Sequence, residues 1–331
     1  MNLREIITDV SQHFILREDF EFQPLVWPLN IYDAIVIRNH NSYRERNFRI
    51  PKITHSLTEQ IKFINQINVE KSVIYADDIS FIPQCPTLQY LKIIPMVADD
   101  KIFDFSPLYE LPEIKFLDCV TDFGNATLKS SPIDYRKING LQFLTIRGQG
   151  HFNYNHIGTL KSLLISGYRH ENLLQMFSST ILDTLSVGQS KISSLDGIDT
   201  SAKMQCLSLY YNRSLKDISR LAYVKNTLKS LRIGNCPKIE DFSVLGELEN
   251  LELLELTGSN EVPDFGFLRT MKNLKTLIVN INVKDGNLAP CLDLSYVHVK
   301  NRKHYNFKDK NLPKGRYVRG NETIEEWRRL E

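Results

Sequence analysis

The sequence predicts an α/β repeat solenoid, in which short parallel strands stack side by side into one sheet. Three observations predict it: the chain repeats itself about every 22 residues, each repeat has the apolar spacing of a strand, and an acidic motif recurs between the strands. A unit this short cannot bury its own apolar face. Neighbouring units must therefore stack and share one continuous core.

The repeating string has the form Leu-x-x-Leu-x-Leu, with Ile, Val, Met or Cys in place of some leucines. Ten copies begin at Leu88, Ile114, Leu141, Leu160, Leu182, Met204, Leu228, Leu251, Leu274 and Leu294. Alternate side chains of a strand share a face, so the leucines of Leu-x-Leu point into the core. We expect the x positions to form the open, concave face of the sheet.

A second motif, Asp-Ile-Ser-x-Leu or a variant of it, lies between the strands. Clear copies begin at Asp104, Asp217 and Asp241, and looser copies begin at Asp78 and Asp264. The carboxylate can accept hydrogen bonds from backbone N–H groups where the chain turns onto the convex side. The apolar residues that follow would then pack back into the core.

Over roughly residues 70–300 this alternation resembles the 22-residue repeats of internalins and related leucine-rich repeat proteins. The resemblance implies a horseshoe or arc with a concave parallel β-sheet and short helical or irregular convex segments, capped at both ends. It also implies a turn position, three residues after the last strand leucine, whose side chain satisfies buried amides. That position holds Ser190, Asn212, Cys236, Ser259 and Asn282.

Three parts of the chain follow from this reading: an N-terminal cap over 1–69, a solenoid of about ten to eleven repeats over 70–300, and a C-terminal cap over 301–331. Both ends of a solenoid expose a slice of core that must be covered.

Local patterns predict structure within and after the N-terminal cap. Ser56-Leu57-Thr58-Glu59 matches a capping box and predicts a helix that begins there. Residues 35–37 predict a β unit before that helix, and residues 73–75 predict a further repeat strand.

Composition narrows the class of protein. The 331 residues carry 41 Lys and Arg against 39 Asp and Glu, a balance that disfavours a dedicated binder of nucleic acid or anionic membranes. No stretch of 18 uninterrupted apolar residues predicts a membrane span, and the N-terminus lacks the pattern of a secretory signal. The five cysteines lack Cys-x-x-Cys spacing and indicate no disulfide framework, so we expect a reducing cytoplasm.

The segment 300–319 is strongly basic, with Asp309 as its one acid. It is read either as a solvated cap or as an arm for an acidic partner such as nucleic acid. We favour the cap because acidic residues return at once, at Glu322, Glu325 and Glu326.

The sequence offers no catalytic motif and implies no cofactor: phosphate-binding, dinucleotide-binding, serine-hydrolase and zinc-protease signatures are absent. His151 and His156 could ligate a metal, but no Cys or carboxylate stands beside them, which favours a surface loop. Cys291-Leu292-Asp293 is similar to the Cys-x-Asp nucleophile motif of certain bacterial repeat-containing ubiquitin ligases. With about 40 residues left after it there is no room for their catalytic domain, so we expect no enzyme.

The concave face is the expected functional surface. Same-position side chains of successive parallel strands lie about 4.8 Å apart, so Tyr90, Phe116 and Phe143 would form an aromatic ladder. Clustered exposed aromatic rings are typical anchors of interfaces, unless a loop or cap covers them.

We therefore expect a non-catalytic scaffold that binds a protein partner of unknown identity through this face and the adjoining loops. No small-molecule substrate is implied. The alternatives for its role are a bacterial immunity protein, an adaptor, an effector or regulator of an enzyme, and a nucleic-acid-associated protein acting through residues 300–319. The residues expected to contact the partner are Tyr90, Lys92, Phe116, Asp118, Phe143, Arg147, Tyr210, Tyr211, Arg232, Glu255, Ile278, Tyr296 and His298.

Overall fold

The computed structural model of the chain describes residues 35–39, 56–97, 101–119, 129–147, 151–177, 182–200 and 203–318. The predicted caps therefore fall partly outside the described residues, at 1–34, 40–55 and 319–331. Backbone contacts divide the chain into two compact units, the first made of Met1–Thr159 with Glu326–Glu331 and the second of Leu160–Glu325.

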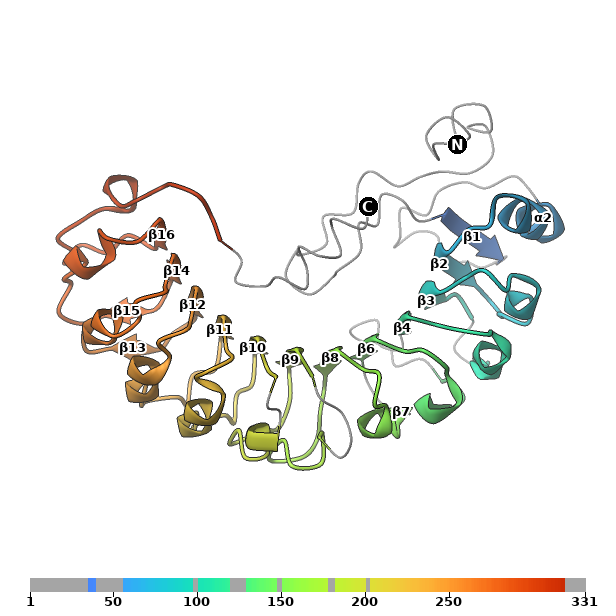
Figure 1. Cartoon of the computed structure of the whole chain (residues 1–331), viewed down its shortest axis with the longest axis horizontal. Helices are drawn as coiled ribbons and strands as arrows, with labels where there is room; N and C mark the ends of the chain where they lie inside the picture. The colour runs from blue at the N-terminus through green and yellow to red at the C-terminus, as the bar shows by residue number, and fades with distance from the viewer. Residues whose placement is uncertain are drawn as a thin grey trace. The chain divides into compact units, whose positions relative to one another are not determined.

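The first unit contains a parallel sheet in which each strand pairs with the next repeat strand of the chain (Figure 1). The predicted β unit and the predicted early repeat strand are its first two members. Its strands are β1 (Ile35–Asn39), β2 (Lys71–Ala76), β3 (Tyr90–Pro95), β4 (Phe116–Cys119) and β6 (Phe143–Arg147).

Helix α2 (Leu57–Ile67) begins where the capping box predicts. The Glu59 N–H donates to the Ser56 hydroxyl at 3.3 Å, and the Ser56 N–H donates to the Glu59 carboxylate at 2.8 Å. These two bonds satisfy donors that a helix start otherwise leaves open. In the described parts of the chain, no helix is long and apolar enough to cross a membrane.

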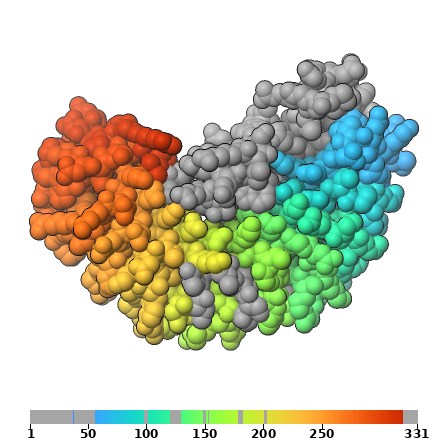
Figure 2. All heavy atoms as spheres, viewed as in Figure 1, coloured from blue at the N-terminus to red at the C-terminus, as the bar shows by residue number. Residues whose placement is uncertain are grey.

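The second unit continues the same construction, and the frame read from the sequence is confirmed by its strand register. Leu207 pairs with Leu231 and Leu231 with Leu254, and all three are at most 1% exposed. In Figure 2 the colour changes in successive slices because each repeat forms one layer. The strands are β8 (Ser162–Ser166), β9 (Thr184–Gly188), β10 (Cys206–Tyr210), β11 (Ser230–Gly234), β12 (Leu253–Thr257), β14 (Thr276–Val279) and β16 (Tyr296–Val299).

Short 3-10 helices and two small parallel strand pairs return the chain from one strand to the next. The strand pairs are β5 (Ile133–Asp134) with β7 (His151–Phe152) and β13 (Glu261–Val262) with β15 (Asn282–Val283). The 3-10 helices are η3 (Ile82–Gln84), η4 (Ser106–Glu110), η5 (Tyr135–Lys137), η6 (Tyr154–His156), η7 (Ile198–Thr200), η8 (Ser219–Val224), η9 (Ser243–Glu247), η10 (Gly266–Arg269), η11 (Ala289–Cys291) and η12 (Asp309–Asn311).

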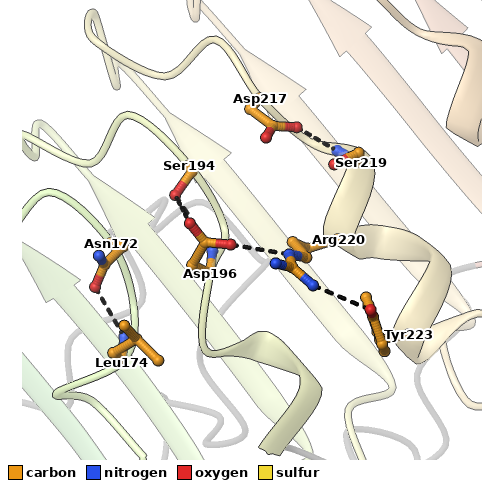
Figure 3. A network of polar contacts seen from close by, with 8 residues as sticks. All are labelled: Asn172, Leu174, Ser194, Asp196, Asp217, Ser219, Arg220 and Tyr223. Carbon is orange, nitrogen blue, oxygen red and sulfur yellow. Dashed lines mark hydrogen bonds and ion pairs between the residues drawn. The ribbon is translucent and has the colours of Figure 1, made fainter.

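The aspartate of the second motif has the predicted capping role in all five copies. Its carboxylate accepts a hydrogen bond from the backbone N–H two residues later, as Asp217 does from Ser219 at 2.9 Å (Figure 3). The other four pairs are Asp78 with Ser80, Asp104 with Ser106, Asp241 with Ser243, and Asp264 with Gly266.

A ladder of side chains fills the turns after β9 to β12, as the resemblance implied. Asn212 is fully buried; its amide donates to the Val187 carbonyl at 2.8 Å and accepts from the Ser190 N–H at 3.0 Å. The Cys236 thiol contacts the carbonyl oxygens of Leu209 and Gly234. Each of these residues thus satisfies a backbone group of the preceding repeat, which binds successive repeats together.

The prediction is wrong at two of the five turn positions. Ser259 is exposed, and Asn260 takes its place by donating to the Cys236 and Ile239 carbonyls at 2.9 Å each. The turn is one residue longer here and passes through Gly258 at φ +123°, a conformation that favours glycine.

Asn282 is the second exception, since it donates to the exposed Glu261 carboxylate. In that repeat a tyrosine from beyond the last strand fills the turn instead. The Tyr305 hydroxyl accepts from the Val283 N–H at 3.0 Å and donates to the Ile281 carbonyl at 3.3 Å.

We expect Asn212→Ala to lower the free energy of unfolding by about 2–4 kcal/mol, because it leaves a buried carbonyl and a buried N–H without partners. Ser259→Ala is the matched control and should change stability by less than about 0.5 kcal/mol, since Ser259 is exposed. Urea unfolding of both variants measures the difference. Equal losses of stability in the two variants would contradict the role given to the buried turn side chains.

Candidate functional site

The concave face is defined here by the strand residues at positions three, five and seven of the frame, which point away from the leucine core. Of the thirteen residues expected to contact a partner, six belong to the first unit and seven to the second. Strand register decides which of them are neighbours within each unit.

The aromatic ladder exists, but two of its three rings are buried. Tyr90 pairs in register with Phe116, and Phe116 with Phe143. Phe116 and Phe143 are each only 3% exposed, and Tyr90 is half-buried. The sequence left an exposed ladder and a covered one as alternatives, and the burial of these two rings favours the covered one, since apolar rings are costly to leave in water.

Beside the ladder lies a charge cluster made of Lys92, Asp118 and Arg147. The fully buried Asp118 carboxylate lies 3.4 Å from the Lys92 ammonium and 3.6 Å from the Arg147 guanidinium. A buried carboxylate is tolerated only where opposite charge compensates for lost hydration. We interpret the cluster as a structural feature of the face, because its central group is closed to solvent.

In the second unit the concave face holds Tyr210, whose ring lies against Gly234 of the neighbouring strand. A Cβ at Gly234 would collide with this ring, so the absence of a side chain there makes room for the ring. Burial raises the pKa of the Tyr210 hydroxyl well above its usual range, and the nearby Glu255 carboxylate raises it further. Tyr210 therefore stays neutral and acts as a packing element.

Arg232, Glu255 and Ile278 occupy position five of three successive strands and pair in register. The Arg232 guanidinium lies 3.2 Å from the Glu255 carboxylate, and both side chains are largely buried. The ion pair fixes the two long side chains in one arrangement, and the half-buried Ile278 follows on the next strand.

Tyr211 follows β10 directly and is 52% exposed, which sets it apart from the buried rings of the face. It has a φ of +57°, and its N–H donates to the Gly234 carbonyl at 2.8 Å. The turn therefore holds its backbone while leaving its ring in solvent.

At β16 the site includes residues that sequence reasoning did not assign to it. His298 lies 3.3 Å from the Asp309 carboxylate, which also accepts hydrogen bonds from the Val299 N–H and the Lys314 ammonium. The half-buried Tyr296 ring packs against Tyr317. The signal for Asp309 was present in the sequence, because it is the one acid in a basic segment.

The two loop histidines do not form a metal site. The His151 imidazole is hydrogen-bonded to the Tyr135 hydroxyl at 2.7 Å, with their rings stacked, while His156 is exposed. Burial lowers the pKa of His151 to about 4, so it is neutral at pH 7. Among the described residues, no three His, Cys, Asp or Glu side chains gather as metal ligands.

Cys291 of the Cys-x-Asp motif is fully buried, and burial raises the pKa of its thiol to about 12. A nucleophilic cysteine needs an accessible thiolate, which this environment disfavours. The structure therefore gives Cys291 a place in the core of the last repeat.

Comparison with known proteins found matches only among solved structures; no family model and no curated protein sequence matches the chain. An internalin of Listeria monocytogenes, InlF, is 17% identical with a TM-score of 0.48, over 76% of this chain and 73% of that one. InlJ of the same organism is 14% identical with a TM-score of 0.26, over 65% and 64%. A leucine-rich repeat protein of Leptospira interrogans is 14% identical with a TM-score of 0.31, over 76% and 83%.

The chain has the leucine-rich repeat solenoid fold that its sequence predicts. Its own geometry shows this, because the repeat strands pair in parallel with their leucines in register.

We expect Phe116→Ala to lower the free energy of unfolding by about 3–5 kcal/mol, as for other buried phenylalanines. Tyr90→Ala, at the half-buried end of the ladder, should cost less. Chemical denaturation of both variants measures this. A loss under about 1 kcal/mol for Phe116→Ala would show that its ring is open to solvent.

We expect His151 to make the protein less stable as the pH falls from about 6.5 to 4. Because its folded pKa is lowered to about 4, the unfolded chain binds more protons in this range. The full loss in the free energy of unfolding is about 3 kcal/mol, because each unit by which the folded pKa lies below the unfolded one is worth about 1.36 kcal/mol. Urea unfolding at pH 7 and pH 4 should show a smaller pH effect in His151→Phe and an unchanged one in the exposed control, His156→Gln. Identical pH effects in both variants would contradict this.

Proposed function

We propose that the chain is a non-catalytic scaffold that binds a protein partner through the concave face of its second unit and the turns that adjoin it. The observation that carries the proposal is Tyr211, whose exposed ring lies at the end of β10, two strands from Glu255. Tyrosine is one of the residues that contribute most to binding in protein interfaces. The buried Arg232 lies on the strand between Tyr211 and Glu255 and supports this surface from below.

The arrangement is organised before any partner binds. The ion pair with Glu255 holds Arg232, and a backbone hydrogen bond to Gly234 holds the turn that carries Tyr211. Side chains that are already ordered lose less conformational entropy on binding, which favours affinity. The half-buried Ile278 and the exposed His298 extend the surface along position five of the next two strands.

A non-catalytic role is supported by the burial and bonding of the two side chains that could have served as a nucleophile or a metal ligand. The Cys291 thiol is buried, and the His151 imidazole is engaged with a tyrosine hydroxyl. A reducing cytoplasm as the working environment is supported by the cysteines, since all five are free and buried.

The nucleic-acid alternative is less favoured because the basic segment is partly engaged with the protein itself. The Lys308 ammonium donates to the Arg302 carbonyl, and the Lys314 ammonium donates to the Asp309 carboxylate. Among protein-binding roles we retain an immunity protein against a toxin, an adaptor and an effector or regulator of an enzyme. The identity of a captured partner distinguishes them.

The test is a quantitative pull-down from the native organism, followed by affinity measurement with the purified partner. Tyr211→Ala should weaken binding about 30-fold, the scale of an interface residue worth about 2 kcal/mol. The matched control is Tyr223→Ala, because Tyr223 is 62% exposed and lies at the 3-10 helices, near Arg220 (Figure 3). This control should bind within twofold of wild type. If Tyr223→Ala loses binding and Tyr211→Ala does not, the interface lies on the side of the solenoid that carries the 3-10 helices.

A further inference from the structure

After the last repeat strand the chain returns to the sheet and pairs with its edge. The Val297 N–H donates to the Pro313 carbonyl and the Gly315 N–H to the Ser295 carbonyl, both at 2.9 Å. Tyr296 and Lys314 thus form an antiparallel bridge. Residues 313–315 cover backbone groups of β16 with which no later strand pairs among the residues that the structure describes.

The next residues leave that edge and lie on the concave face. The Tyr317 ring packs edge-on against Tyr296, with centroids 5.4 Å apart. The Val318 N–H then donates to the Thr276 hydroxyl at 2.9 Å. Thr276 lies on β14, the strand that pairs with β16. Thr276 is fully buried although it points away from the leucine core. In Figure 1 this segment is the last stretch of red trace, which passes β16 before the chain is drawn in grey.

A separate extended peptide could make the same contacts. The face offers an aromatic ring at Tyr296, a hydroxyl acceptor at Thr276 and a carboxylate at Asp309. The Lys314 ammonium lies 2.8 Å from that carboxylate and 5.6 Å from the centroid of the Tyr296 ring. These groups suit a positively charged residue and, a few positions later, an aromatic one.

We infer that the concave face of β14 and β16 is a receptor for an extended segment in which a basic residue precedes an aromatic one, and that residues 314–318 occupy it as an internal strap that a partner must displace. This rests on the proposed function and states what kind of segment the partner presents.

The strap buries little apolar surface. Lys314, Gly315 and Arg316 are exposed, and only Tyr317 and Val318 are half-buried on the face. Segments with few buried apolar contacts open locally at low cost in free energy. Because the strap belongs to the same chain, its effective concentration is in the millimolar range, so it lowers the apparent affinity of any competing segment.

The experiment measures binding of a fluorescent peptide, Leu-Pro-Lys-Gly-Arg-Tyr-Val, which copies residues 312–318, to the full-length protein. Two variants release the strap without changing the face. In Gly315→Ala the new Cβ would come within 2.8 Å of the Ser295 carbonyl oxygen, and Tyr317→Ala removes the anchoring ring. Gly246→Ala is the matched control, since its Cβ would meet nothing closer than 3.7 Å.

We expect both release variants to bind the peptide at least about tenfold more tightly than wild type and Gly246→Ala do, because the internal competitor is gone. A peptide with Ala in place of Tyr should lose this binding. Equal binding to all four proteins, or binding to none, would overturn the inference. If both release variants fail to fold in a circular dichroism melt, the segment is a structural cap and the inference is wrong.

The outcomes also separate this inference from the proposed function. A partner whose binding depends on Tyr211, together with no peptide binding, contradicts the strap alone. Peptide binding to the release variants, together with no Tyr211-dependent partner, contradicts the proposed function alone.

Discussion

Stacking of leucines between successive parallel strands is the constraint on which the rest of the structure depends. Leu207, Leu231 and Leu254 are buried only because each has a counterpart in the neighbouring repeat. The turns obey the same rule, since Asn212 satisfies a carbonyl and an N–H of the repeat before it. No repeat is complete alone, and the spacing of side chains on the concave face follows from this shared register.

The concave face is polar and aromatic, yet much of it is closed to solvent. Asp118 is buried between two cations, and Arg232 and Glu255 neutralise each other across neighbouring strands. These pairs fix the shape of the face more than they offer charge to a partner. Tyr211, in the turn after β10, differs from these buried groups because its ring is 52% exposed, which is why the proposed interface is centred on it.

In the described part of the second unit no repeat strand follows β16, and the segment after it makes contacts that a following repeat makes elsewhere. Tyr305 fills the turn that an asparagine or cysteine fills elsewhere, and residues 313–315 pair with β16. The same segment then passes onto the concave face at Tyr317. One stretch of chain thus both pairs with the edge of β16 and covers part of the concave face.

The sequence by itself determined the fold, the strand register, the start of helix α2 and the five aspartate caps, because each depends on local spacing that repeats along the chain. It did not determine whether Phe116 is open or covered, because position three of the frame specifies only the face on which a ring lies. It missed Asn260, because a single added residue shifts the turn. It also missed the roles of Tyr305 and Asp309, because the chain beyond β16 lies outside the repeat frame that locates the other contacts. Only the tertiary structure decided these points, since burial and pairing across the end of a solenoid depend on which segments return to it.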